Sequence, residues 1–219
     1  MIDIYLIRHG ESEVNVQHRR ASWHEKRICG TNTWSELTEK GIDQSRTLGE
    51  YLKKCGPCFD RIYSSSTVRA QQTARYCLEE MGFEWPRIQV DHRITELDQG
   101  IWEGKVDCKT RTDDIKQNMD AMNWHFTPPE GESQYDVFCR ANEFIEEKIL
   151  GKEYENIAVF THQNVIACLL TGLVGLDKNK IHEMELLHTS MTVLRYDENR
   201  LDTIVKGEIP HIMEMMSYE

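Results

Sequence analysis

The most chemically informative segment of the sequence is Arg8-His9-Gly10-Glu11, which directly follows the apolar run Ile4-Tyr5-Leu6-Ile7. A guanidinium donates paired hydrogen bonds to phosphate oxygens, and a neutral imidazole beside it can attack a phosphoryl group. A short buried strand that ends in a glycine turn would present both side chains at its end. The segment therefore favours phosphoryl chemistry.

A second arginine and a second histidine occupy comparable positions further along the chain. Arg69 opens the helix that follows an expected strand at 59–63, and His162 follows an expected strand at 156–161. The carboxyl ends of parallel strands form the usual ligand site of such sheets, and helix N-termini add N–H donors there. We therefore expect two histidines and two arginines to converge on one tetrahedral dianion.

The elements that must position these side chains alternate along the chain. We expect strands at 2–7, 59–63 and 156–161, helices at 38–54, 67–81, 133–150 and 165–173, and a late hairpin at 191–196 and 200–205. This order predicts an α/β fold of three layers, in which helices flank a mostly parallel central sheet. We interpret residues 1–219 as a single domain, and the aperiodic segment 105–130 as an inserted lid.

Composition excludes several classes of function. Hydrophobic residues at 39% and charged residues at 29% are typical of a soluble globular protein, and no apolar run reaches the roughly 18 residues of a membrane span. The net charge of −11 argues against nucleic acid and anionic membranes as partners. Because the first apolar run is too short for a signal peptide, we expect a cytoplasmic protein.

Residues 18–27 carry a local excess of positive charge within this acidic chain. They include three basic side chains in addition to His18, Arg19 and Arg20, opposed only by Glu25. Two interpretations remain open: a solvated basic loop, or a mobile rim that attracts phosphate-bearing substrates.

The seven cysteines are odd in number and mostly scattered, as in a reducing compartment. Cys55-Gly56-Pro57-Cys58 matches the redox motif of thioredoxins, but here the motif follows a helix and precedes a strand. We therefore interpret it as a helix stop and turn. A structural zinc site is not expected, since no second cysteine or histidine pair has matching spacing.

Six ordered motifs together resemble the histidine phosphatase superfamily, which includes the cofactor-dependent phosphoglycerate mutases and related phosphatases. The motifs are Arg8-His9-Gly10-Glu11 with Asn15; Leu37-Thr38 with Gly41 and Gln44; Ser64-Ser65 with Arg69-Ala70 and Gln72-Thr73-Ala74; Glu96 with Gly100, Trp102, Glu103 and Gly104; Gly131-Glu132-Ser133 with Asp136 and Arg140; and Thr161-His162.

The resemblance implies that His9 is the nucleophile that becomes phosphorylated. Arg8, Arg69 and His162 would then clamp the phosphoryl oxygens, and Glu96 would donate and accept the proton. On chemistry alone other carboxylates could fill this last role, and only the family spacing selects Glu96 among them; the others are Glu11, Glu13, Asp98 and Glu103.

Three further residues are expected to contact the substrate: Asn15, Thr31 and Gln163. Gln163 stands where the family usually has glycine, so its side chain should narrow the pocket or touch the leaving group.

Three functions remain in view, and a phosphatase is favoured. Mutases of this fold carry an inserted segment rich in arginines, whereas this chain has only Lys105, Lys109, Arg111 and Lys116 between its expected proton donor and residue 131. We therefore expect a phosphomonoester hydrolase that needs neither metal nor cofactor and acts on a small phosphorylated metabolite. The alternatives are a phosphoglycerate mutase and a lapsed enzyme that only binds phosphorylated ligands. A homodimer is an open option.

Overall fold

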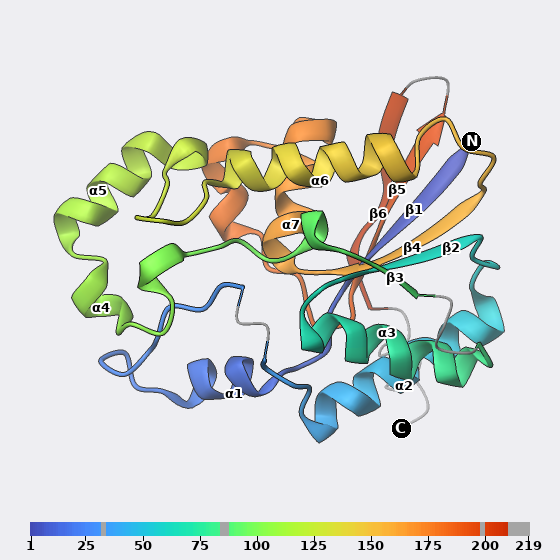
Figure 1. The fold of residues 1–219 in the computed structure, drawn as a ribbon, viewed down its shortest axis with the longest axis horizontal. Coiled ribbons are helices and arrows are strands. Elements are labelled where there is room, and N and C mark those ends of the chain that lie inside the picture. Colours follow the sequence, from blue (N-terminus) through green and yellow to red (C-terminus); the bar gives the residue numbers. More distant parts are fainter. Residues whose placement is uncertain (32–33, 84–87, 198–199, 210–219) are drawn as a thin grey trace.

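One mixed sheet organises the molecule. The computed structural model describes residues 1–31, 34–83, 88–197 and 200–209. In these residues six strands pair in the order β3-β2-β4-β1-β5-β6, the first four parallel and the last two antiparallel (Figure 1). The strands are β1 (Ile2–Arg8), β2 (Arg61–Ser65), β3 (Ile88–Asp91), β4 (Asn156–Thr161), β5 (Met191–Asp197) and β6 (Arg200–Glu208).

Helices cover both faces of this sheet, as the alternating pattern predicts. Helices α2 (Glu39–Cys55) and α3 (Val68–Met81) pack on one face, and α6 (Gln134–Lys148) and α7 (Gln163–Leu169) pack on the other (Figure 1). The predicted three-layer α/β fold with a mostly parallel sheet is therefore confirmed.

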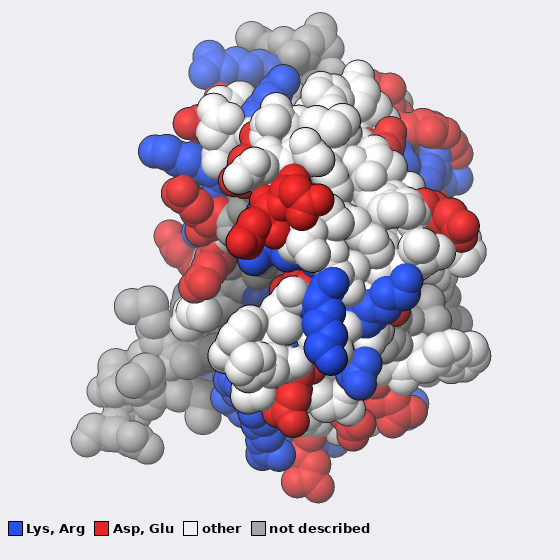
Figure 2. Space-filling view, turned by 90° about the vertical axis from the view of Figure 1, so that its left-hand side faces the viewer, with Lys and Arg blue, Asp and Glu red and all other residues white. Residues whose placement is uncertain are grey.

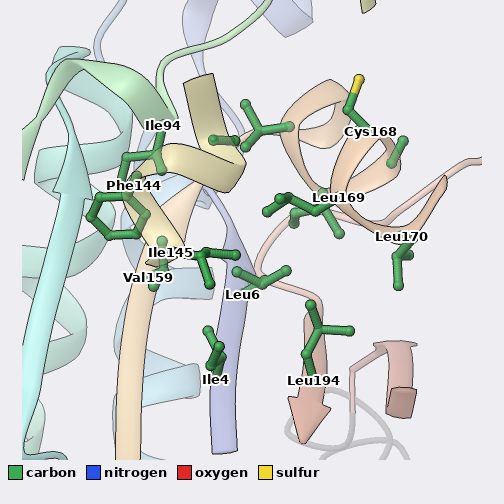
Figure 3. Close-up of a cluster of buried hydrophobic side chains, with 14 of the residues drawn as sticks. Ile4, Leu6, Ile94, Phe144, Ile145, Val159, Cys168, Leu169, Leu170 and Leu194 are labelled. Carbon is green, nitrogen blue, oxygen red and sulfur yellow. The ribbon is translucent and has the colours of Figure 1, made fainter. Parts of the chain in front are cut away.

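Successive residues of β1 enter opposite halves of the core. Ile4 and Leu6 are fully buried against α6 and α7, as Figure 3 shows, whereas Ile7 joins the cluster under α2 and α3. Burying one such side chain stabilises the folded state by about 1.5–3 kcal/mol. This burial on both faces holds the end of β1, and with it the Arg8-His9 pair, in a fixed position.

Local sequence signals set the ends of several elements. The Thr38 hydroxyl accepts a hydrogen bond from the Gly41 amide at 3.1 Å and caps α2. Gly82 ends α3 with a φ of 82°, and Ser133 begins α6 with a capping box. The expected strand at 59–63 is displaced in the structure, where β2 spans Arg61–Ser65.

Helix α7 also differs from the expected 165–173. It begins directly after His162, and a wider turn over Leu170–Val174 continues it. Since helix α7 begins this early, Gln163 and Asn164 form its first turn at the carboxyl end of β4.

Four strands and helices of the structure were not expected from the sequence. Besides β3, they are α1 (Glu13–Arg20), α4 (Asp107–Thr110) and α5 (Asp113–Met122), none of which contains a fully buried residue. The prediction of a basic loop at 18–27 was therefore wrong for its first three residues, which form the last turn of α1. The segment 105–130 forms α4, α5 and a turn around the buried Trp124; its role as a lid stays a prediction.

The late hairpin is confirmed, with Asp197 paired to Arg200; residues 198–199 of its expected turn lie outside the described residues. Cys55 and Cys58 are exposed thiols at the end of α2, consistent with a turn. In the described part of the chain, no helix combines the length and apolarity that a membrane crossing requires.

Candidate active site

A cavity of about 520 Å³ lies at the carboxyl ends of the parallel strands. Its lining includes six of the predicted site residues, Arg8, His9, Asn15, Arg69, Glu96 and Gln163. They come from β1, α1, α3, the segment after β3, and the start of α7. Tertiary structure thus brings together side chains that are up to 155 positions apart in the sequence.

The His9 ring is buried, and its environment keeps it neutral. Its Nδ1 lies 2.8 Å from the Gly10 carbonyl oxygen, and because a carbonyl only accepts, Nδ1 carries the proton. Its Nε2 therefore holds a lone pair, toward which Arg69 Nε donates at 3.3 Å. Burial, followed by the positive charges of Arg69 and Arg8, holds the pKa of His9 well below its usual value.

The second histidine lies beside the first, with ring centroids 5.1 Å apart. His162 Nε2 lies 2.8 Å from the Ser65 hydroxyl and 3.2 Å from the Thr67 hydroxyl. Its buried Nδ1 has no hydrogen-bond partner among the described residues. When a hydroxyl donates to Nε2, the proton sits on Nδ1, which can then donate to a bound oxyanion. Burial and Arg69 lower the pKa of His162 as well.

The two arginines are anchored by backbone carbonyls. Arg8 donates to the Leu186 carbonyl, and Arg69 donates to the Gly30 carbonyl at 3.1 Å. Burial lowers the pKa of both guanidinium groups, and the nearby Glu96 carboxylate opposes that effect. Since an arginine stays charged in proteins, both present fixed positive charge to the cavity.

Of the five carboxylates that could serve as the proton donor, Glu96 lines this cavity and the other four do not. Glu96 Oε1 accepts from the Leu97 amide at 2.9 Å. Glu11 instead pairs with Arg19 at 2.6 Å, and Asp98 accepts from the Gly100 amide at 2.7 Å. Glu13 is exposed in the first turn of α1.

The three expected substrate contacts have different surroundings. Gln163 lines the cavity beside Asn164. Asn15 Oδ1 caps α1 by accepting from Ser12, and it lies 3.2 Å from Nε2 of His188. Thr31 is not among the residues that line the cavity; its amide and hydroxyl both donate to Glu103 Oε1, at 2.6 and 2.9 Å.

Sequence reasoning made no prediction for His188, which lies beside the cavity-lining His9. His188 lies with its ring centroid 5.9 Å from that of His9, and burial and Arg8 lower its pKa to about 4. The position of His188 could have been inferred from the expected hairpin: β5 runs antiparallel to β1, so the residues that precede β5 lie near the carboxyl end of β1. The wall also includes Arg27, from the basic segment 18–27, and Asp107 and Arg111, from the segment 105–130 that was expected to form a lid.

At position 30 of this wall there is no room for a side chain. A Cβ there would lie 2.0 Å from Glu103 Oε1, whereas the Gly30 carbonyl accepts from Arg69. Because position 30 has no side chain, the Arg69 guanidinium can contact the Gly30 carbonyl while the Glu103 carboxylate contacts the Thr31 amide.

Charge on this side of the molecule is arranged in groups. Figure 2, which faces the left-hand side of Figure 1, shows a group of Asp and Glu side chains near the middle of the surface and several Lys and Arg side chains below it, with further charges of both signs around them. The local excess of positive charge lies in the cavity itself, whose described lining carries four arginines and two acids although the net charge is −11. Within the described residues, no group of three or more His, Cys, Asp and Glu side chains could hold a metal ion.

Comparisons with known proteins agree with this arrangement. A 2,3-bisphosphoglycerate-dependent phosphoglycerate mutase from Bartonella bacilliformis is 30% identical over 212 residues, covering 94% of this chain and 97% of the relative. The alpha-ribazole phosphatase from Shigella flexneri has the same fold, with a TM-score of 0.76, 23% identity, and coverage of 94% of this chain and 96% of that chain.

A phosphoserine phosphatase mutant from Entamoeba histolytica also has this fold, with a TM-score of 0.77, 22% identity, and coverage of 97% of this chain and 100% of that chain. The family model for the histidine phosphatase superfamily (branch 1) matches residues 4–207. The chain therefore belongs to the histidine phosphatase superfamily.

Proposed function

We propose that the protein is a metal-independent phosphomonoesterase that works through a phosphohistidine at His9. The observation that carries this proposal is the protonation of His9: its proton is on Nδ1, so the lone pair of Nε2 in a neutral imidazole faces the Arg69 guanidinium, with the charge of Arg8 nearby. A nucleophile and an oxyanion clamp are thus combined at the floor of one cavity.

In the first half of the reaction, His9 Nε2 attacks phosphorus and the bond from phosphorus to the ester oxygen breaks. Arg69 turns its donors from the imidazole to the phosphoryl oxygens, which Arg8 and His162 Nδ1 also contact. The protonated Glu96 carboxyl transfers its proton to the departing alkoxide, a contribution typically worth about 10² to 10⁴ in rate. The products are the free alcohol and phospho-His9.

In the second half, the Glu96 carboxylate accepts a proton from water as the water oxygen attacks phosphorus. The N–P bond breaks, inorganic phosphate leaves, and the electron pair returns to His9 Nε2. The positive charges of Arg8 and Arg69 stabilise the equatorial oxygens in both halves.

A direct test is rapid-quench labelling with a ³²P-phosphomonoester, together with steady-state release of inorganic phosphate from p-nitrophenyl phosphate. We expect acid-labile label on His9, loss of label and turnover in His9→Ala, and unchanged turnover in EDTA. Turnover without label on His9 would contradict the proposal. If the well-folded protein released no phosphate from a broad panel of esters, it would instead be a lapsed enzyme that only binds phosphorylated ligands.

A second candidate is phosphoglycerate mutase, favoured by the name of the curated relative that is 30% identical over nearly the whole chain. Against it, the described wall of the cavity holds only two arginines besides Arg8 and Arg69, namely Arg27 and Arg111, and Asp107 lies beside them. Supplying 3-phosphoglycerate with catalytic 2,3-bisphosphoglycerate separates the two. Rapid isomerisation without phosphate release would establish the mutase.

A further inference from the structure

A second cavity, of about 460 Å³, adjoins the 520 Å³ cavity that contains His9, which we call the phosphoryl cavity. The two share five lining residues: Val14 and His18 of α1, and Arg27, Ile28 and Cys29 of the following segment. The second cavity continues along α1 past Gln17 and Ala21 to Glu25. Each cavity alone has the size of a typical small-molecule site, so together they exceed what a three-carbon phosphoester fills.

The two cavities differ in charge. Among the described residues, four arginines and two acids line the phosphoryl cavity, whereas one arginine and two acids, Glu25 and Glu103, line the second. His18 adds no compensating charge at neutral pH, because burial and Lys26 lower its pKa. The serine at position 22 donates to Glu25 at 2.7 Å and lowers the pKa of that carboxyl, which stays ionised.

The polar side chains of the second cavity offer both kinds of hydrogen-bonding group: Glu25 and Glu103 accept, whereas Gln17 and Arg27 can also donate. Ionised carboxylates accept hydrogen bonds and do not donate them, and Arg27 already donates to the Gly104 carbonyl at 2.6 Å. Val14, Ala21 and Ile28 supply apolar surface between these polar groups. Hydroxyl groups on a carbon skeleton fit this combination, whereas a carboxylate would face two like charges.

A smaller cavity of about 210 Å³ lies on the other side and shares only Arg111 and Asn164 with the phosphoryl cavity. It therefore offers less room and a narrower common wall than the cavity along α1.

We propose that the second cavity receives the leaving group of the substrate, and that this leaving group is a neutral polyhydroxy alcohol longer than three carbons. The inference rests on the proposed phosphatase function and names its substrate class: a phosphomonoester of a sugar or sugar alcohol. The phosphoryl group sits at His9, and the hydroxyl-bearing chain extends along α1 toward Glu25 and Glu103.

Matched substrates test the charge preference in the unaltered protein. Sorbitol 6-phosphate and 6-phosphogluconate share an open six-carbon chain and differ at the far end by a hydroxymethyl group against a carboxylate. We expect kcat/KM to favour sorbitol 6-phosphate by about tenfold, and Glu25→Gln to reduce that preference about threefold, since Glu25 is exposed and its charge is screened. Equal rates, or a preference for 6-phosphogluconate, would overturn the inference.

A cavity-filling variant tests the path of the leaving group. Ala21→Phe should lower kcat/KM for sorbitol 6-phosphate about tenfold and leave glycerol 3-phosphate within about twofold. Ala121→Phe makes the same change at an exposed alanine of α5 that lines neither cavity, and should affect neither substrate. Equal losses on both substrates in a folded Ala21→Phe protein would overturn the inference.

The outcomes separate the two proposals. Suppose that phosphate release depends on His9 but shows no preference for sorbitol 6-phosphate and no selective effect of Ala21→Phe. That result would overturn the proposed substrate class and leave the phosphatase function in place. Absence of any release that depends on His9 overturns both.

Discussion

Two hydroxyl groups hold the ring of His162, and the orientation of that ring decides whether it can donate to a phosphoryl oxygen. Ser65 lies 2.8 Å and Thr67 3.2 Å from its Nε2. We therefore predict that Ser65→Ala lowers kcat about tenfold with little change in KM, because the proton and the ring lose their preferred position. Steady-state kinetics on p-nitrophenyl phosphate measure this.

The matched control is Ser64→Ala, since the neighbouring buried hydroxyl donates to the Ser65 carbonyl and not to His162. Equal effects of the two substitutions would show that strand packing, and not the ring of His162, accounts for the loss.

The protonation of His9 predicts an unusual pH dependence at the first chemical step. Because burial and two arginines hold its pKa well below 6.5, the ring stays neutral as the pH falls from 7 to 5.5. Single-turnover ³²P labelling should therefore keep its rate within about twofold over this range. An ordinary histidine would lose about tenfold at pH 5.5, and a loss of that size would contradict the assignment.

Among the elements, α1 is attached to the rest of the fold mainly through its ends. None of its residues is fully buried, yet it presents Val14, Asn15 and His18 to the cavity. The buried Glu11 carboxylate holds the far end of α1 through Arg19 at 2.6 Å and accepts from the Thr38 hydroxyl at 3.1 Å. The Arg19 ion pair thus holds the carboxyl end of α1, whereas contacts such as the Val14 amide to the Ser35 hydroxyl hold its beginning.

We predict that Arg19→Ala loosens α1 more than it destabilises the protein. A half-exposed ion pair is worth about 0.2–1 kcal/mol, which corresponds to roughly 1.4-fold to fivefold in local opening. Chymotrypsin should therefore cleave faster at the exposed Trp23, and KM should rise about threefold. Arg20→Ala changes the adjacent exposed arginine and should do neither; identical behaviour of the two variants would refute the role of the Glu11 pair.

At the scale of the whole molecule, three neutral histidines, two of them buried and one half-buried, make folding sensitive to acid. His9, His162 and His188 all have pKa values lowered by burial and by nearby arginines. The unfolded chain takes up protons near pH 6.5, whereas the folded chain takes them up only at lower pH. The free energy of unfolding therefore falls as the pH drops below about 6.5.

His188 allows a quantitative prediction, because its pKa is about 4. Between pH 7 and pH 5 this one group should cost about 2 kcal/mol of stability. In urea unfolding, the free energy of unfolding of His188→Gln should therefore fall between pH 7 and pH 5 by about 2 kcal/mol less than that of the unaltered protein. His92→Gln, at an exposed histidine, should leave the loss unchanged. If both variants lost stability as the unaltered protein does, His188 would not be responsible.

The fold followed from patterns that act locally. The run of apolar residues in β1 and β4, the cap at Thr38 and the stop at Gly82 are signals carried by neighbouring residues, and the alternation of strands and helices admits few arrangements. The strand-end positions of His9, Arg69 and His162 were predictable for the same reason. By contrast, α1, α4 and α5 bury no residue completely and were not predicted as helices.

The sequence by itself thus determined the layered sheet, the family and the principal candidates for phosphoryl chemistry, because hydrophobic periodicity and strand-end position are local properties. Only the tertiary structure decided that Glu96 reaches the cavity while Glu11 pairs with Arg19, and that His188 approaches His9. Those outcomes depend on distances between segments remote in the chain, which the packing of the sheet and helices establishes.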